Sequence, residues 1–380
     1  MSNIGTKSIG IKAPLVKKGD NIVDIVVNSV LDATLSSYYL DTPIYSLNDN
    51  DIIGVTESVV ARSQGNYVSI DDIAEDIVSK YGKYATIDLI EPIYSRNRFA
   101  MILKGVARGC KKIRILMPEH DEVVNVSRDH PFTKMNYDEY YNEICEKEGC
   151  ILEIYDTPTF LEHKNNLNLL LCQLHVSKED AYNALNMYIN GSVSHVYSLS
   201  DICSDRCEYG VLGSNKSTEE TLKLFPRKCD KITDDGKLIL GSDTIVMKIK
   251  ERIKEETGRD VIVVVYADGC FKDPVGGIWE FADPVSMVSF TDEDLIMSTP
   301  NELKLKAHID EYKGENLDEY IKESIKNKDK DLKGNMKSQG TTPRLIRDLV
   351  ASLMDLTSGS GDKGTPIVLV QNYFKNFSND

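Results

Sequence analysis

Val261-Ile-Val-Val-Val-Tyr266 is the most strongly patterned segment of the chain, and it leads directly into Ala267-Asp268-Gly-Cys-Phe-Lys-Asp273-Pro-Val-Gly-Gly277. Six apolar, mostly β-branched residues in a row are typical of a strand that is buried on both faces. The strand ends at an aspartate, and the loop after it holds three glycines, which let backbone N–H groups approach a ligand closely. Such a fixed carboxylate could bind a metal ion beside a phosphate, or it could begin an ordinary acidic loop.

The composition is that of a globular protein whose 380 residues suffice for two or three domains. Apolar residues make up 41% of the chain and charged residues 28%, both ordinary values. The net charge of −15 argues against a nucleic-acid partner, because most of the surface would repel phosphate. A local group of lysines and arginines, or a bound divalent cation, can still create a site for an anionic ligand.

No segment approaches the roughly 20 apolar residues that a membrane span needs, and residues 1–10 lack the apolar core of a signal peptide. We therefore expect a cytoplasmic protein that does not enter a membrane and whose eight cysteines are mostly reduced. The spacing of Cys203 and Cys207 could contribute to a metal site, but no second pair lies at a suitable distance.

The first half of the chain divides into two segments. Residues 1–110 form one predicted part, and residues 111–200 show a β-α-β rhythm that indicates an inserted α/β subdomain. The elements expected in the first segment are a helix at 22–30, a strand at 51–56, a short helix or turn at 57–65 and an amphipathic helix at 70–78. Those expected in the second are a strand at 112–117, a helix at 137–148 and a strand at 150–155.

The second half begins with residues 201–300, which contain the buried strand. A helix is expected before it, capped by Ser242 or Asp243 and stopped at Thr257-Gly258. Residues 301–340 are polar and rich in lysine, which indicates a surface excursion or a mobile flap. Residues 341–380 hold a helix at 343–356, a Gly/Ser loop and a final strand at 366–370.

Several well-known signatures are absent from the sequence, namely the P-loop, G-x-G-x-x-G after a strand, G-x-S-x-G and H-E-x-x-H. Gly359-Ser-Gly-Asp-Lys-Gly364 is rich in glycine, but it lies between a helix and a strand, the reverse of a P-loop. It is therefore interpreted as a connecting loop. An enzyme that uses a nucleotide would need a less familiar fold.

A more specific pattern lies near the N-terminus. Ile9-Gly-Ile-Lys-Ala-Pro-Leu-Val16 is followed by Lys18-Gly-Asp20, the hydrophobic helix and Asp49-Asn-Asp-Ile-Ile-Gly-Val-Thr-Glu-Ser-Val-Val-Ala-Arg-Ser-Gln-Gly65. This order resembles the γ-glutamyl ligase family of the deazaflavin coenzyme F-420. That family opens with a Pro-Leu-Ile segment, a Gly-Asp pair, an Asp-Ile-Leu strand and Thr-Glu-Lys-Val-Val-Ser-Lys-x-x-Gly.

The resemblance continues through three later segments and covers roughly half of the chain in family order. Gly210-Val-Leu-Gly-Ser-Asn215 is similar to the family's Gly-Ile-Asp-x-Ser-Asn. The helix at 243–257, the buried strand and Asp268-Gly-Cys-Phe271 are similar to its Ile-Ser-Asp-Thr-Phe-Gly-Arg block. Residues 346–370 are similar to its Ala-Asp-Glu-Leu-Ala helix and the Gly-x-Pro-Val-Val-Leu-Val that follows.

The resemblance implies an α+β, γ-glutamyl-ligase-like two-domain fold that carries the inserted α/β subdomain, in a homodimer. It also implies an amide ligase that adds L-glutamate to a carboxylate of a small acceptor similar to coenzyme F-420-0. The family uses GTP and Mg²⁺ or Mn²⁺ and proceeds through an acyl phosphate. This chemistry is reasonable, because a carboxylate is inert toward amines until it is phosphorylated, and phosphoryl transfer needs neutralised phosphates.

Site residues follow from the resemblance by position. Arg62 replaces a lysine near the phosphates and keeps its positive charge. Asp268 and Asp348 match metal-binding positions, the latter a metal or nucleotide site. The positions that match nucleotide-binding residues are Ala13, Pro14, Leu15, Val16, Glu57, Ser58, Arg62 and Asn215.

The sequence departs from the family pattern at expected metal ligands. Leu212 replaces an aspartate, Gly269 replaces a threonine, and Leu349 replaces the second acid of the C-terminal pair. Nearby acids could supply replacement ligands or could be solvated loop charges. These acids are Asp273, Glu280 and Asp283.

Two alternatives stay open. The same chemistry could act on another acceptor, such as a folate, or the chain could be a non-catalytic homologue that binds a nucleotide or metabolite. Leu212 and Gly269 favour the non-catalytic reading, and the retained site residues oppose it. Taken singly, these residues also have ordinary readings: Glu57 could cap a helix, Arg62 could be a surface cation, Asn215 could hold a turn and Asp348 could be a helix-surface acid.

Overall fold

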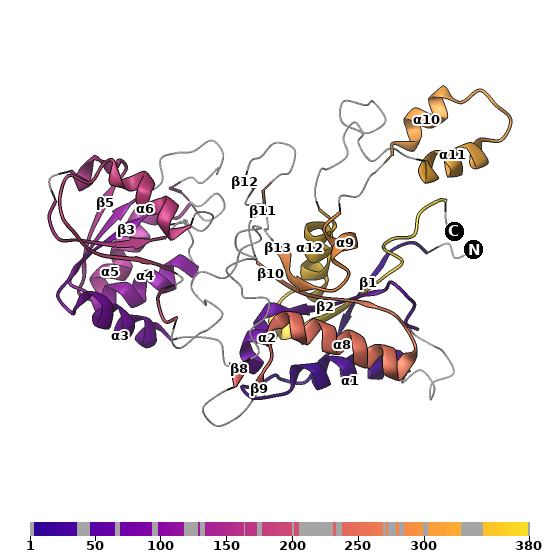
Figure 1. Ribbon diagram of the computed structural model, residues 1–380, viewed down its shortest axis with the longest axis horizontal. Coiled ribbons are helices and arrows are strands. Elements are labelled where there is room, and N and C mark those ends of the chain that lie inside the picture. Colours follow the sequence, from indigo (N-terminus) through magenta and orange to yellow (C-terminus); the bar gives the residue numbers. More distant parts are fainter. Residues whose placement is uncertain are drawn as a thin grey trace. The chain divides into compact units, whose positions relative to one another are not determined.

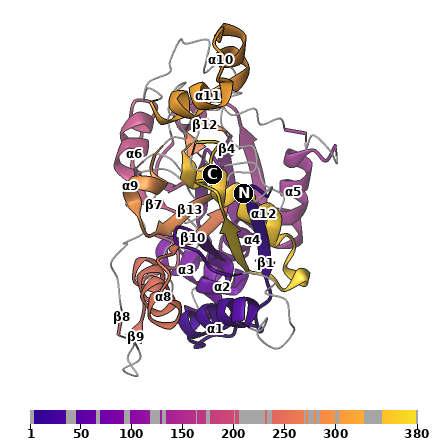
Figure 2. The same cartoon turned by 90° about the vertical axis from the view of Figure 1, so that its right-hand side faces the viewer.

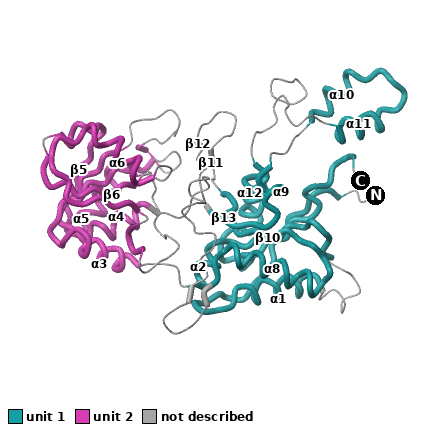
Figure 3. The backbone as a smooth tube through the Cα atoms, viewed as in Figure 1, with its two compact units in different colours: residues 1–64, 227–278, 282–380 teal, residues 65–226, 279–281 magenta. Residues whose placement is uncertain are grey.

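The computed structural model describes residues 4–35, 46–64, 69–92, 98–117, 128–129, 134–162, 164–172, 177–199, 201–204, 231–232, 238–268, 271–272, 279–280, 285–298, 303–327 and 345–378. The chain forms two compact units (Figure 3), and each is described by itself. Unit 1 comprises residues 1–64, 227–278 and 282–380, and unit 2 comprises residues 65–226 and 279–281.

A mixed five-stranded sheet forms the centre of unit 1 (Figure 1). β2 and β10 run parallel to each other, and every other neighbouring pair of strands is antiparallel. β1, β2 and β10 therefore point one way, and β14 and β13 point the other way. Across the sheet the strands are β1 (Lys7–Ile11), β14 (Ile367–Gln371), β2 (Ile52–Thr56), β10 (Ile262–Asp268) and β13 (Val285–Phe290).

Helices cover both faces of this sheet (Figure 1). One face packs against α1 (Ile22–Leu35), α2 (Glu57–Gln64) and α8 (Ser242–Thr257), and the other packs against α9 (Glu293–Ile296) and α12 (Ile346–Ser358). Alternate residues of β10 enter the two cores, so that Val263 lies in one and Val264 in the other. The predicted strand at 261–266, buried on both faces, is confirmed.

Two local features explain how the helices fit. Gly54 in β2 allows α12 to approach closely, because a Cβ at this position would lie 2.2 Å from the Sδ atom of Met354. α8 stops at Gly258, whose φ of 70° is left-handed, as the sequence predicts. The predicted cap at its other end is wrong: Gly241 is the N-cap, and the hydroxyl of Ser242 instead hydrogen-bonds to that of Ser289 in β13.

The rest of unit 1 consists of short elements. α10 and α11 pack against each other as a helical hairpin (Figure 2), in which the rings of Tyr312 and Tyr320 stack 4.6 Å apart. Gln64 Nε2 donates a hydrogen bond to the Leu240 carbonyl at 2.7 Å. These elements are β8 (Lys231–Ile232), β9 (Leu238–Ile239), β11 (Phe271–Lys272), α10 (Leu305–Glu311), α11 (Leu317–Lys326) and the 3-10 turn η4 (Gly361–Lys363).

Unit 2 is built on a five-stranded sheet in which every strand is parallel to its neighbours. Its strand order begins at the centre with the first strand in the sequence, β3, and grows outward in both directions, an arrangement typical of doubly wound α/β domains. Across the sheet the strands are β5 (Ile151–Tyr155), β4 (Lys112–Leu116), β3 (Thr86–Ile90), β6 (Leu167–Leu171) and β7 (Val193–Ser198). The short strand β12 (Trp279–Glu280) also belongs to this unit.

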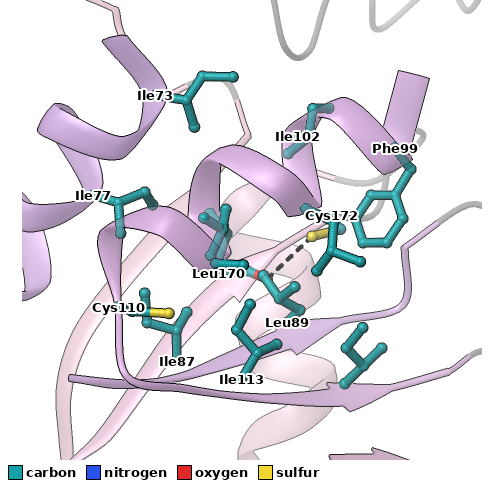
Figure 4. Close-up of a cluster of buried hydrophobic side chains, with 14 of the residues drawn as sticks. Ile73, Ile77, Ile87, Leu89, Phe99, Ile102, Cys110, Ile113, Leu170 and Cys172 are labelled. Atoms are coloured by element: carbon teal, nitrogen blue, oxygen red, sulfur yellow. Dashed lines mark hydrogen bonds between the residues drawn. The ribbon is translucent and has the colours of Figure 1, made fainter. Parts of the chain in front are cut away.

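Apolar residues on both faces of this sheet pack against helices, as a parallel sheet requires. α3 (Ile70–Tyr81), α4 (Arg98–Gly109) and α5 (Tyr137–Lys147) cover one face, and α6 (Lys178–Asn186) and the 3-10 turn η2 (Pro158–Leu161) cover the other. Figure 4 shows part of the larger core, with Ile77 of α3 and Phe99 of α4 on the same side as Leu89 of β3.

The sequence predicts the mixed content of this fold. Mixed α and β content is present, and the β-α-β rhythm of residues 111–200 corresponds to β4, α5 and β5. Unit 2 also includes α3, β3 and α4, which precede residue 111. Among the helices that the structure describes, none has an apolar stretch long enough to cross a bilayer.

Candidate functional site

The candidate site lies at one edge of the unit 1 sheet, where β1, β2 and β10 end and β14 and β13 begin. The strand register fixes this arrangement, since Ile367 at the start of β14 pairs with Ile11 on one side and Val55 on the other. Asp268 at the end of β10 pairs with Val285 at the start of β13. Connecting segments distant in sequence therefore meet at a single edge, which we call the carboxyl edge.

The segment Ala13–Val16 follows β1 and is tied to this edge at both sides. The Ala13 N–H donates to the carbonyl of Gly364 at 3.1 Å, and beyond the segment the Gly19 N–H donates to the carbonyl of Ser63 in α2 at 2.7 Å. Ala13 and Val16 pack against the apolar layer beneath, whereas Pro14 is exposed and Leu15 is 90% exposed. The predicted nucleotide-binding segment thus presents an accessible apolar surface beside α2.

Glu57, Ser58 and Arg62 follow β2 without an intervening loop, because the last strand residue, Thr56, is followed at once by the first residue of α2. The Thr56 N–H donates to the carbonyl of Pro366 at 3.0 Å, which holds the start of α2 against the start of β14. Ser58 and Arg62 are exposed, and Glu57 is half-buried. The start of α2 lies at this edge and favours a bound anion, whereas Arg62 lies in the last turn of the same helix.

Asp268 is the last residue of β10. Because Tyr266 pairs with Thr56 in the parallel strand β2, the backbone of Asp268 lies beside the start of α2. Glu280 lies in β12, and the description does not extend to its side chain. The other proposed neighbours, Asn215, Asp273 and Asp283, and the departures Leu212 and Gly269, lie outside the described residues.

Asp348 approaches the same edge from α12. Its side chain is buried, and one carboxylate oxygen accepts a hydrogen bond from the Ser286 hydroxyl at 2.6 Å. The Arg347 Nε atom lies 3.4 Å from that oxygen. Ser286 follows Val285, the partner of Asp268, so the carboxylate is fixed near the first residues of β13. It can help to hold a cation there or can balance the buried guanidinium of Arg347.

The sequence alone does not predict one contributor to this edge. From the sequence, Gly359–Gly364 is interpreted as a plain connecting loop. In the structure, the Gly364 carbonyl accepts a hydrogen bond from the Ala13 N–H, so this loop lies beside the predicted nucleotide-binding segment. The signal that points to this loop is its position directly before the final strand, where the family pattern places Gly-x-Pro. Lys363, which is exposed, adds a positive charge to the loop.

The side chains at the carboxyl edge that could bind a metal ion are carboxylates, which are the ligands that Mg²⁺ and Mn²⁺ prefer. Within the described part of the chain, no three histidine, cysteine or acidic side chains are grouped closely enough to hold a metal ion. Tyr266, beneath α12, is buried, and this burial raises its pKa to about 12, so its phenol stays neutral. Binding of a nucleotide and of a metal ion at this edge stays a prediction from the sequence.

Comparison with known proteins gives one extensive match. A model of the family described as F420-0:Gamma-glutamyl ligase matches residues 10–372. No curated protein matches the chain.

Two solved structures are similar to parts of the chain, with TM-scores too low to support an argument about the fold. The crystal structure of eIF2B beta from Chaetomium thermophilum has 11% identity and a TM-score of 0.21, over 36% of this chain and 43% of that one. The chain thus spans less than half of that protein. The crystal structure of a putative aspartate carbamoyltransferase from Leishmania major Friedlin has 14% identity and a TM-score of 0.23, over 52% of this chain and 70% of that one.

Proposed function

The chain belongs to the F420-0:gamma-glutamyl ligase family, and from this premise we propose that it is a GTP- and divalent-metal-dependent amide ligase. Membership implies γ-glutamyl ligase activity on F420-0. The reaction that we propose adds L-glutamate to a carboxylate of an F420-0-like acceptor through an acyl phosphate. We further propose that the protein acts as a cytoplasmic homodimer. A folate-like acceptor is the alternative with the same chemistry.

One observation carries this proposal. The strand register brings the ends of β1, β2 and β10 to one edge, and with them the segment Ala13–Val16, the start of α2 and the backbone of Asp268. Asp268 lies about 200 residues after the other two pieces in sequence, yet each piece corresponds to a site motif of the family. Their convergence is what a binding site for a nucleotide and a cation requires.

The residues of the edge suit the two steps of the proposed reaction. In the first step an acceptor carboxylate oxygen forms a bond to the terminal phosphorus of the nucleotide, and the bond from that phosphorus to the bridging oxygen breaks. Arg62 would stabilise the charge on the phosphate, and Ala13–Val16 would contact the nucleotide. Asp268, with Asp348 and acids near it, would hold the Mg²⁺ or Mn²⁺, which neutralises phosphate charge when bound.

In the second step the amine of glutamate forms a bond to the acyl carbon, and inorganic phosphate leaves with the pair of electrons from the broken C–O bond. The amine proton passes to the leaving phosphate or to solvent. The apolar surface of Leu15 would limit water at the nucleotide, since an acyl phosphate hydrolyses when water reaches it.

The decisive experiment is an incubation of the protein with GTP or ATP, Mg²⁺ or Mn²⁺, glutamate and a panel of acceptors that includes F420-0 and a folate. We expect nucleoside diphosphate and a product heavier by one glutamyl unit. Without nucleotide hydrolysis and product for any member of the panel, the ligase proposal is abandoned.

A matched pair of variants tests the site itself. Asp268→Asn removes a carboxylate at one end of β10, whereas Asp260→Asn removes one just before its other end, where Asp260 is exposed and lies 3.3 Å from Lys250. We expect Asp268→Asn to lower turnover by at least about 100-fold, as loss of transition-state charge stabilisation does. Asp260→Asn should leave turnover unchanged. Equal turnover in both variants would remove Asp268 from the site.

The second candidate function is binding without catalysis. The observation that favours it is the loss of two expected metal ligands, since Leu212 and Gly269 replace an aspartate and a threonine of the family pattern. This function predicts nucleotide binding with no turnover for any acceptor. Metal-dependent binding of GTP, measured by calorimetry on the wild type and on Asp268→Asn, distinguishes it from a chain that binds no nucleotide.

A further inference from the structure

Three buried cysteines, distant in sequence, meet in the core of unit 2 near the amino ends of β4 and β5. Cys110 follows α4, Cys145 lies in the last turn of α5, and Cys150 directly precedes β5. Their exposed fractions are 8%, 0% and 4%, so all three are enclosed by the core that Figure 4 shows in part. We call this group the thiol cluster.

The backbone holds two of these thiols face to face. β4 and β5 are parallel neighbours in which Lys112 pairs with Ile151, and the Ile151 N–H donates to the Lys111 carbonyl at 3.1 Å. Cys110 and Cys150 therefore precede adjacent strands at positions that are offset by one residue from the register, and their Sγ atoms lie 3.8 Å apart. A disulfide needs an Sγ–Sγ distance of about 2.05 Å, so the two side chains must turn toward each other for the bond to form.

The three thiols are not equivalent. Hydrogen bonds from the Cys110 and Cys145 thiols lower the pKa of Cys150, whereas bonding to Cys150 together with burial raises the pKa values of Cys110 and Cys145. A thiolate is the nucleophilic form of cysteine. The Cys150 sulfur adjoins the exposed Gly149 and faces the Cys110 sulfur at 3.8 Å, so its position suits it to react first.

We propose that Cys110 and Cys150 form an oxidation site, in which a small peroxide converts the two thiols to a disulfide. The Cys150 sulfur attacks one peroxide oxygen, the O–O bond breaks, and a sulfenic acid and water are formed. The Cys110 sulfur then attacks the Cys150 sulfur, the S–O bond breaks, and hydroxide leaves with the Cys110 proton as water. Two thiols and one hydrogen peroxide thereby give one disulfide and two waters.

The neighbouring turn allows a small oxidant to approach. Gly149 has a φ of 74°, is exposed and has no atom within 4 Å of the position where a Cβ would lie. Cys150 is therefore one residue away from open surface. A disulfide between Cys110 and Cys150 would join the end of α4 to the start of β5. It would close a loop between two cysteines that are 40 residues apart in sequence.

Cys172 provides a matched comparison within the same core. It is 1% exposed, and its Sγ atom donates to the carbonyl of Leu170 at 3.5 Å (Figure 4). The Cys172 thiol thus donates to a carbonyl, whereas the sulfurs of Cys110 and Cys150 face each other. Burial alone therefore does not predict the site, whereas the facing pair of sulfurs does.

The test is to treat the full chain with graded hydrogen peroxide, alkylate the remaining thiols in denaturant and map the peptides without reduction. We expect a linked pair of peptides that joins Cys110 to Cys150, lighter than the free peptides by two hydrogens and separated again by dithiothreitol. The link should persist in Cys145→Ser and Cys172→Ser and should vanish in Cys110→Ser and Cys150→Ser.

Two results would overturn the proposal. One is that Cys110 and Cys150 stay fully alkylated at peroxide doses that oxidise other cysteines of the chain, and the other is a link that uses Cys145. Cys110→Ala and Cys150→Ala replace the serine variants if circular dichroism shows that serine disturbs the core. Peptide mapping of the wild type remains decisive in either case, because it needs no variant. The readout is independent of ligase turnover, so its failure would not bear on the proposed reaction.

Discussion

The two five-stranded sheets of this protein are assembled in opposite ways. The unit 1 sheet combines strands from residues 7–11, 52–56, 262–290 and 367–371, in mixed orientation. The unit 2 sheet draws all its strands from residues 86–198, and they are parallel throughout. The unit 1 sheet therefore depends on long-range pairing, whereas the unit 2 sheet is complete within one stretch of chain.

This difference affects where site residues can gather. In unit 1 the carboxyl edge receives segments from the beginning, middle and end of the chain, so its site residues lie far apart in sequence. In unit 2 all five strands come from residues 86–198, so residues that gather at the ends of its strands lie closer together in sequence. The three tests below examine whether the two sheets are energetically separate, from the largest expected effect to the smallest.

Val368→Asp should produce the largest effect. Val368 lies in β14, pairs with Gly10 and Gly54 and is fully buried among residues that face α12. An unpaired buried charge should lower the free energy of unfolding of unit 1 by about 4 kcal/mol or more. Hydrogen exchange read by mass spectrometry should show loss of protection in unit 1, with unit 2 unchanged.

The matched control is Ile151→Asp, which places the same side chain in a strand of unit 2. Ile151 is 55% exposed, so this variant should change protection in neither unit appreciably. If Val368→Asp also removed protection from β3 to β7, the two sheets would unfold together and the comparison would fail.

Gly105→Val tests the packing of unit 2 and should have an intermediate effect. A Cβ at Gly105 in α4 would lie 2.7 Å from the Cβ of Ile73 in α3, so a larger side chain must push the two helices apart. We expect unit 2 to lose about 2 kcal/mol of stability. Urea denaturation followed by the exchange of unit 2 amides measures this loss.

Met101→Val is the control for a β-branched residue in the same helix, because Met101 is 56% exposed. Its cost should be that of helix propensity alone, a few tenths of a kcal/mol. A similar loss in both variants would mean that contact between α3 and α4 is not the cause.

Glu148→Gln should have the smallest effect and should depend on pH. Two hydrogen bonds from Arg108, of 2.8 and 2.9 Å, lower the pKa of the Glu148 carboxyl below its ordinary value of 4.5. The pair therefore contributes stability above that pH, and the contribution is lost as the pH falls through the lowered pKa of the folded state. The variant should cost unit 2 about 0.5 kcal/mol at neutral pH.

Thermal unfolding of the variant and the wild type across the acid range checks this expectation. Their difference should shrink once the wild-type carboxyl is protonated. Glu143→Gln is the control, because Glu143 forms an exposed pair with Lys147 in α5. A difference for Glu148→Gln that stays constant into strong acid would show that the ion pair is not responsible.

The sequence predicts those elements whose signal is local. Continuous β-branched residues predicted β10, and the left-handed glycine predicted the end of α8. The N-cap of α8 was predicted wrongly, because the hydroxyl of Ser242 is engaged by Ser289, a contact between elements that are distant in sequence. Capping propensity shows which side chains can cap a helix. It does not show whether a side chain forms a hydrogen bond with a residue distant in sequence instead.

The candidate site shows the same limit. The order of the family-like motifs predicts which residues belong to the site. The pairing of β2 with β10 had to come from the structure, since the local sequence does not show the register between strands about 200 residues apart. The hydrogen bond from Ser286 to Asp348 is equally non-local. Cysteines that are scattered along the sequence likewise form a cluster only when β4 and β5 become neighbours. The metal and nucleotide assignments stay predictions.

The hydrogen bond from Gln64 to Leu240 bears on how this chain could have evolved. It joins the last residue of α2, where the chain leaves unit 1, to a position shortly after the chain returns. Within unit 1, Gln64 and Leu240 are therefore held side by side. A segment with such closely spaced ends can be gained, exchanged or lost as a module while the surrounding sheet keeps its register.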